Sequence, residues 1–283
     1  MDKTLCEQFD ILRSSFSDDL ENYDSIDFHQ NENIKYYCSS GESGKTECKT
    51  DLDKINAGCL WLFEQLFLKN GKNINTVEYI IIWLSYKLNK KTYAEIKNLN
   101  DFYTKCIENN THYTNCKQSD QDCSTSLKNK VGYQNYKEII NKRKNLFNIS
   151  IENMSKIYDV FKPLCNVYTE LGGSNTLSEK SLKDAKQIVE KYNELNVSDI
   201  SEDSPYYRVL STLLNDYNNL KEYCGSSSVG CIDTLSLTPT ETEESGMQSS
   251  EKICNDTPSF SICSLFVLRK RAQKQYLREK VKK

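Results

Sequence analysis

The chain has 283 residues, of which 37% are hydrophobic and 27% charged, so most of it can fold into a globular body. The net charge of −3 conceals an asymmetry. Residues 269–283 contain eight lysines or arginines and one acid, a charge of +7, which leaves −10 on residues 1–268. An acidic body of this kind excludes a nucleic-acid-binding face outside the terminal segment.

The first half of the chain predicts a series of helices. Apolar residues recur every three or four positions in residues 5–16 and again in residues 51–69. Residues 76–88, TVEYIIIWLSYKL, are apolar nearly all round, which is typical of a buried central helix. A further helix is predicted over residues 93–106.

Helical spacing resumes over residues 133–168, where Pro163 predicts a break or a kink. A stripe of apolar residues then predicts a helix over residues 177–195. The last predicted helix covers residues 205–224, with Ser204 as its N-cap and proline in its first turn.

No segment alternates between apolar and polar residues over a useful length, so we predict an all-α fold with one domain over residues 1–224. Its exposed loops are expected at residues 17–50 and 107–132. Six residues at helical spacing are predicted to be buried: Cys59, Ile80, Trp83, Phe161, Leu213 and Tyr217.

Three segments of different character follow the domain. Residues 225–258 are rich in Ser, Thr and Glu and predict a disordered stalk. Residues 259–268 form an apolar stub, and residues 269–283 form a basic tail of the cytoplasmic type. This order is typical of a type I surface protein. The nine mostly apolar residues from Phe260 to Leu268, however, would reach as a helix only about 14 Å across a hydrocarbon core of about 30 Å.

The chain contains twelve cysteines and no pair at CxxC spacing, which favours disulfides in an oxidising compartment over a zinc ribbon. No signal peptide is evident in the first thirty residues, which conflicts with conventional secretion. We expect most of ten cysteines to be paired, although spacing leaves the connectivity open: Cys6, Cys38, Cys48, Cys59, Cys106, Cys116, Cys123, Cys165, Cys224 and Cys231. Cys38 with Cys48 and Cys224 with Cys231 are close enough to pair.

The sequence gives only weak signals for catalytic or ligand-binding sites. GESGKT at residues 41–46 lacks the first glycine and the preceding strand of a phosphate-binding loop. Cys106, His112, Cys116 and Cys123 offer zinc-ligand types, but their spacing matches no common module. We therefore predict no enzyme activity, no cofactor and no small-molecule substrate.

The chain resembles the Plasmodium interspersed repeat (PIR) family of variant antigens, in the Cir/Yir/Bir form of rodent malaria parasites. The most specific match is YYCSSGESGKTECKTDLDKINAGCLWLFEQLF at residues 36–67. Further matching segments are LCEQFDILRSSF, INTVEYIIIWLSYKLN, FYTKCIENNTHYTNC and RKRAQKQYLREKVKK.

The resemblance implies a non-enzymatic, disulfide-bonded helical ectodomain, exported to the infected erythrocyte without a usual signal peptide. It also implies a role in antigenic variation, with host antibody or an unidentified host receptor as partner. An internal scaffold or adaptor of parasite or host-cell membranes is the alternative. Relatives carry a full apolar span before the basic tail, and here most of that span is missing.

The tail itself predicts peripheral membrane binding. Basic residues surround an apolar stripe on one helix, which suits an anionic lipid surface. Cys263 is a candidate for acylation, which would add a second anchor. The predicted membrane-surface residues are Arg269, Lys270, Arg271, Lys274, Arg278, Lys280, Lys282 and Lys283.

Overall fold

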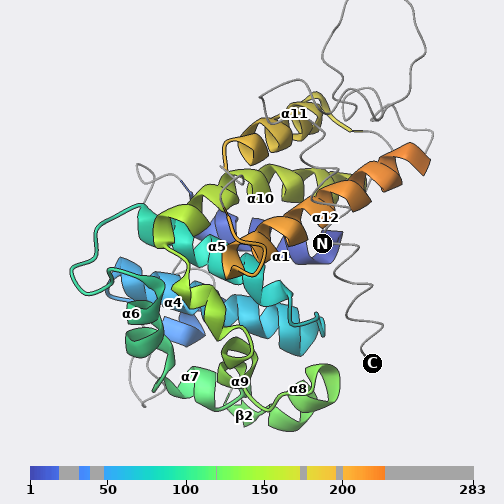
Figure 1. Ribbon diagram of the computed structural model, residues 1–283. Helices are drawn as coiled ribbons and strands as arrows, with labels where there is room; N and C mark the ends of the chain where they lie inside the picture. The colour runs from blue at the N-terminus through green and yellow to red at the C-terminus, as the bar shows by residue number, and fades with distance from the viewer. Residues whose placement is uncertain (19–31, 39–47, 119, 173–176, 196–199, 227–283) are drawn as a thin grey trace, which may run out of the picture.

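The computed structural model describes residues 1–18, 32–38, 48–118, 120–172, 177–195 and 200–226 (Figure 1). The first half of this chain forms α1 (Lys3–Ser15), α3 (Glu32–Lys35), the 3-10 turn η2 (Tyr36–Cys38), α4 (Asp51–Phe63), the π-helical η3 (Glu64–Lys69), α5 (Thr76–Asn89), α6 (Leu99–Phe102) and the π-helical η4 (Tyr103–Ile107).

The second half contains a two-stranded ribbon between short helices, followed by three long helices. Its elements are α7 (Thr111–Thr114), β1 (Lys117–Gln118), β2 (Gln121–Asp122), α8 (Ser124–Val131), α9 (Tyr136–Asn141), the 3-10 turn η5 (Lys144–Asn148), α10 (Ile151–Leu171), α11 (Glu179–Asn193) and α12 (Pro205–Ser226). Apart from the end of α12, the predicted stalk, stub and basic tail lie outside the described residues.

Helix α5 lies at the centre of the body, between α4 and α10 (Figure 1). Twelve of its fourteen residues are buried, because a helix without a polar face is most stable when it is covered on all sides. The ring of Trp83 is completely buried, and α4 approaches it at Gly58. A Cβ atom at position 58 would lie 2.7 Å from the Trp83 ring, so glycine permits this close contact.

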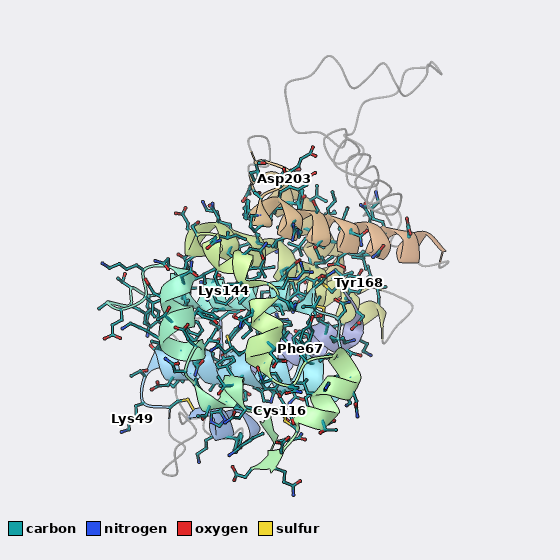
Figure 2. The ribbon with its side chains drawn as sticks, turned by 60° about the horizontal axis from the view of Figure 1, so that its bottom comes forward. Lys49, Phe67, Cys116, Lys144, Tyr168 and Asp203 are labelled. Carbon is teal, nitrogen blue, oxygen red and sulfur yellow. A yellow bond between two sulfur atoms is a disulfide. The ribbon has the colours of Figure 1, made fainter. Side chains whose placement is uncertain are left out.

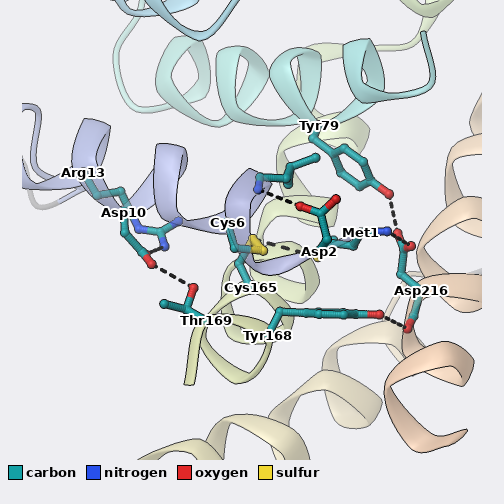
Figure 3. Close-up of a disulfide and its surroundings, with 11 residues drawn as sticks. Met1, Asp2, Cys6, Asp10, Arg13, Tyr79, Cys165, Tyr168, Thr169 and Asp216 are labelled. Atoms are coloured by element: carbon teal, nitrogen blue, oxygen red, sulfur yellow. Dashed lines mark hydrogen bonds and ion pairs between the residues drawn. A yellow bond between two sulfur atoms is a disulfide. The ribbon is translucent and has the colours of Figure 1, made fainter. Parts of the chain in front are cut away.

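Helix α1 packs against α10, and a disulfide joins the two helices (Figure 3). Cys6 of α1 bonds Cys165 of α10 across 159 positions of sequence. One turn along α1, Phe9 meets Phe161 edge to face, with 4.9 Å between the ring centroids. Phe161 also stacks on Tyr79 of α5, so these three rings link α1, α10 and α5.

A buried polar cluster ties the start of the chain to α12 (Figure 3). The amino group of Met1 lies 2.5 Å from the Asp216 carboxylate, and the Tyr79 hydroxyl donates to the same carboxylate. Tyr168 donates to the Asp216 carbonyl at 2.8 Å. Burial, followed by the negative charge of Asp216, raises the pKa of Tyr79, so this phenol remains a donor.

The structure confirms the predicted helical fold, and the six residues predicted to be buried are all buried. Ser204 caps α12 as expected, since its hydroxyl accepts from the Tyr207 backbone N–H at 3.0 Å. Helix α12 continues two residues beyond the predicted boundary at residue 224.

Three details of the prediction were wrong. The helix expected from residue 93 begins only at Leu99, where Asn98 and Asp101 form a capping box. Of the break or kink expected at Pro163, the break does not occur, because Phe161 and Leu164 remain packed in the core and offset the lost hydrogen bond. The loop expected over residues 107–132 contains α7, the ribbon and α8, which the absence of an apolar stripe concealed.

A second buried polar cluster closes the end of α1. The Lys87 ammonium donates to the carbonyls of Phe16 and Ser17 at 3.0 and 2.7 Å and lies 3.2 Å from Asp18. Tyr158 and Lys162 donate to the same Asp18 carboxylate at 2.9 and 2.8 Å. Burial lowers the pKa of Lys87 to about 8, although the Asp18 charge opposes that shift. Burial would raise the pKa of Asp18, but the charge of Lys87 and the hydrogen bonds hold it below its usual range.

We expect Asp18→Asn to destabilise the domain by about 3 kcal/mol near pH 6, because Lys87 is left buried without its counter-charge. The ion pair is lost as the pH falls through the lowered pKa of Asp18 or rises through about 8. Without the Asp18 charge the pKa of Lys87 falls further, so the folded variant releases this proton at a lower pH than the folded wild type does. The stability deficit of the variant therefore shrinks as the pH rises to about 8, where Lys87 becomes neutral in both proteins.

Urea unfolding of the wild type and Asp18→Asn at about pH 6 and about pH 9.5 measures this effect. Asp203→Asn, at an exposed position, is the matched control. A deficit of equal size at both pH values would contradict the assignment.

Candidate interaction surface

Two short disulfide loops lie within the segments that the sequence predicts as exposed. Cys38 bonds Cys48 across 10 positions, and Cys116 bonds Cys123 across 7. With Cys6–Cys165, these bonds account for six of the ten candidate cysteines. The side chain of Cys224 and all of Cys231 lie outside the described residues.

Cys59 and Cys106 are free thiols, so these two of the ten candidate cysteines do not pair. Cys59 is only 2% exposed, on the face of α4 that enters the core. Burial raises the pKa of the Cys59 thiol well above its ordinary value and that of Cys106 to about 12. Both therefore remain protonated near neutral pH, and neither provides a thiolate nucleophile.

The zinc set considered from the sequence is not assembled. The bond between Cys116 and Cys123 uses two of its four ligand atoms. His112 is 7% exposed and packs edgewise on the rings of Tyr36 and Tyr37, with centroid distances of 5.4 and 5.3 Å. In the part of the chain that the structure describes, no three potential metal ligands lie together.

The Cys116–Cys123 loop is a small hairpin at the surface. Lys117 pairs with Asp122 and Gln118 with Gln121, and all four side chains are exposed. Asp120 adopts a left-handed conformation with φ of 64°, which aspartate tolerates better than most residues. The cystine at the base is buried, so the hairpin presents only its polar residues to solvent.

The hairpin contacts the segment that carries the other disulfide. The Tyr36 hydroxyl, beside Cys38, donates to the Asp120 carboxylate at 3.1 Å and accepts from the Asp120 backbone N–H at 3.3 Å. Figure 2 shows Cys116 and Lys49, which follows Cys48, toward the same end of the molecule. We call Tyr36, Lys49 and residues 117–122 the two-loop surface.

A buried carboxylate anchors both parts of the two-loop surface. Glu64 of η3 is 6% exposed and accepts from Tyr37 at 2.7 Å and from Gln118 at 3.0 Å. Lys69 lies 3.1 Å from the same carboxylate and supplies the compensating charge. Burial, with the nearby Tyr136 and Glu64, raises the pKa of Tyr37, so Tyr37 stays protonated and can donate.

Sequence reasoning missed Glu64 because it falls within a segment read only for its apolar residues. A signal was present: Leu60 and Leu68 lie one helical turn before and after Glu64, and both are buried. A charged residue on such a stripe is buried with its partners or disrupts the helix.

The described part of the chain contains no helix that is both long and apolar enough to cross a membrane. The basic tail and Cys263 lie outside the described residues, as do the GESGKT motif and most of the predicted loop 17–50.

Comparison with known proteins identifies the family. Residues 6–268 match the model of the Plasmodium variant antigen protein Cir/Yir/Bir. The chain belongs to the Cir/Yir/Bir family. This match spans the predicted domain, stalk and stub and ends where the basic tail begins. No curated protein matches the chain.

Among solved structures, the chain is similar to the ectodomain of a Plasmodium PIR protein. The two share 30% sequence identity and superpose with a TM-score of 0.57. The alignment covers 80% of this chain and 94% of the ectodomain. The likeness therefore extends over nearly the whole helical body, and the matching family is one of variant antigens.

We expect Glu64→Ala to loosen the two-loop surface and to lower stability by about 2 kcal/mol, because Tyr37 and Gln118 lose their shared acceptor. Amide hydrogen exchange should accelerate at Asp120 and Cys123 more than at the centre of α5. Glu95→Ala, which removes an exposed carboxylate, serves as control and should leave both rates unchanged. Unchanged exchange at Asp120 in Glu64→Ala would refute the anchoring role.

Proposed function

We propose that the chain is a variant surface antigen, exported to the infected erythrocyte, and that the two-loop surface faces host antibody or a host receptor. Family membership is the observation that carries the antigen assignment. The assignment of the exposed surface draws on the polar hairpin at residues 117–122, which a buried cystine and Glu64 hold to the helical body.

This arrangement suits antigenic variation. The side chains of Lys117, Gln118, Gln121 and Asp122 are exposed, so their replacement alters the surface that an antibody contacts. Surface substitutions away from caps and buried networks usually change stability by no more than about 0.5 kcal/mol. Gln118 and Asp122 are exceptions, because Gln118 binds Glu64 and Asp122 accepts from the backbone N–H and the hydroxyl of Ser124 at the start of α8.

Labelling of intact infected cells tests the surface assignment. The probe is an antibody that binds the folded chain and loses binding on Lys117→Ala combined with Gln121→Ala. Lys186→Ala combined with Gln187→Ala, at exposed positions on α11, is the matched control and should leave binding intact. We expect labelling without permeabilisation. Labelling only after permeabilisation would instead favour the internal scaffold or adaptor of parasite or host-cell membranes.

We further propose that the basic tail and the stub hold the chain on a membrane surface. Each tail cation contributes about 1 kcal/mol at an anionic membrane, and this contribution falls with ionic strength. Replacement of Arg269, Lys270 and Arg271 by Ala should therefore weaken binding to vesicles that contain anionic lipid by roughly 100-fold at low salt. Equal binding by the variant and the wild type would contradict this role, and retention of the chain on membranes through carbonate and high salt would indicate anchoring by the stub or by acylated Cys263.

A further inference from the structure

Helix α12 meets α5 at two buried carboxylates. Glu78, in the first turn of α5, is 1% exposed, and Asp216 of α12 is 3% exposed. Asp216 is well supplied with partners, because the Met1 amino group and the Tyr79 hydroxyl both bind its carboxylate. Glu78 differs: one of its oxygens, Oε2, has no hydrogen-bond partner among the described residues.

We propose that the contact between α12 and α5 is a proton-dependent latch, in which protonation of Glu78 strengthens the packing of α12 on the body. An ionised carboxylate with an unpaired buried oxygen is costly, whereas its neutral acid form is not. Residues beyond α12 carry the predicted stalk, so this latch would act on the helix that joins the body to the stalk.

The charges around Glu78 determine the direction of the effect. Burial raises the pKa of Glu78, and the nearby charge of Asp216 raises it further. The Thr212 hydroxyl, Arg143 and Arg208 oppose the shift, as does the N-terminal end of α5, but the pKa remains above its ordinary value. No ion pair joins Glu78 to either arginine in the described part of the chain, so their charges act only from a distance.

Protonation of Glu78 makes the folded state more stable at low pH than at high pH. The folded state binds the Glu78 proton more tightly than the unfolded state does. The stabilisation is therefore complete below the unfolded pKa and is lost as the pH rises through the folded one. The pKa of Asp216 is also raised by burial, against the lowering effect of the Met1 amino group, and it adds a change of the same sign. The pKa of Asp18 is lowered, so the stability that Asp18 contributes is lost as the pH falls. The test must therefore separate the effect of Glu78 from the effects of the other buried carboxylates.

The variant Glu78→Gln isolates it, because the amide resembles the protonated acid at every pH. We expect amides in residues 209–220 of the full-length variant to be more protected from exchange than in the wild type at about pH 7.5. After correction for intrinsic exchange rates, the difference should shrink as the pH falls through the raised pKa of Glu78, because the wild-type carboxylate is then protonated as well. Glu190→Gln, at an exposed position of α11, should show no such difference.

Glu78→Met provides a second neutral side chain of similar length, in case the glutamine amide finds no partners of its own. It should reproduce the convergence with the wild type at low pH. A difference from the wild type that does not change with pH in either variant would overturn the proposal, as would lower protection than the wild type in both variants at about pH 7.5.

Discussion

The disulfide between Cys6 and Cys165 is the constraint on which the arrangement of the body depends. It holds the first helix against α10, and both helices contribute rings to the stack that reaches Tyr79 of the central helix. In an unfolded chain this bond closes a loop spanning 159 positions, so it removes more conformational freedom than either short disulfide. The bond thereby fixes α1 to a helix far along the chain.

Polar groups inside the body mainly form hydrogen bonds and ion pairs that connect different helices. Asp216 joins the start of the chain to α12, Asp18 and Lys87 close the end of α1, and Glu64 holds the two-loop surface. None of these clusters combines an accessible nucleophile with a general base, and the two free thiols that the structure describes are held protonated by burial. Replacement of exposed hairpin residues other than Gln118 therefore changes the surface and leaves these hydrogen-bonded clusters in place.

The helices could be predicted from sequence where their apolar stripe was continuous. Trp83 and Tyr217 illustrate this, because their spacing alone placed them in the core. The ribbon of β1 and β2 could not be predicted, because the side chains of its four strand residues are exposed and leave no apolar pattern. The buried Cys116–Cys123 bond at its base could not be read from spacing alone. A break in α10 at Pro163 was predicted for a related reason. Proline removes a helical hydrogen bond, and the packing of distant residues that keeps the helix intact leaves no local signal.

The candidate surface was predicted only in outline. Residues 107–132 were placed only approximately, and most of residues 17–50 lie outside the described residues. The contact between the two disulfide loops depends on Tyr36, Asp120 and Glu64, which lie far apart in sequence. Hydrogen bonds between distant residues leave no periodic pattern in a single chain. The pairing of Cys6 with Cys165 was hidden for the same reason, because spacing alone does not select one partner among many.

The stability of a Cys6→Ala, Cys165→Ala double variant tests the central claim most directly. Loop-closure entropy predicts a loss of about 5 kcal/mol, against about 2 kcal/mol for Cys116→Ala with Cys123→Ala. Denaturant unfolding of both variants beside the wild type under non-reducing conditions measures the difference. A loss from the Cys6–Cys165 pair no larger than that from the short loop would contradict the account.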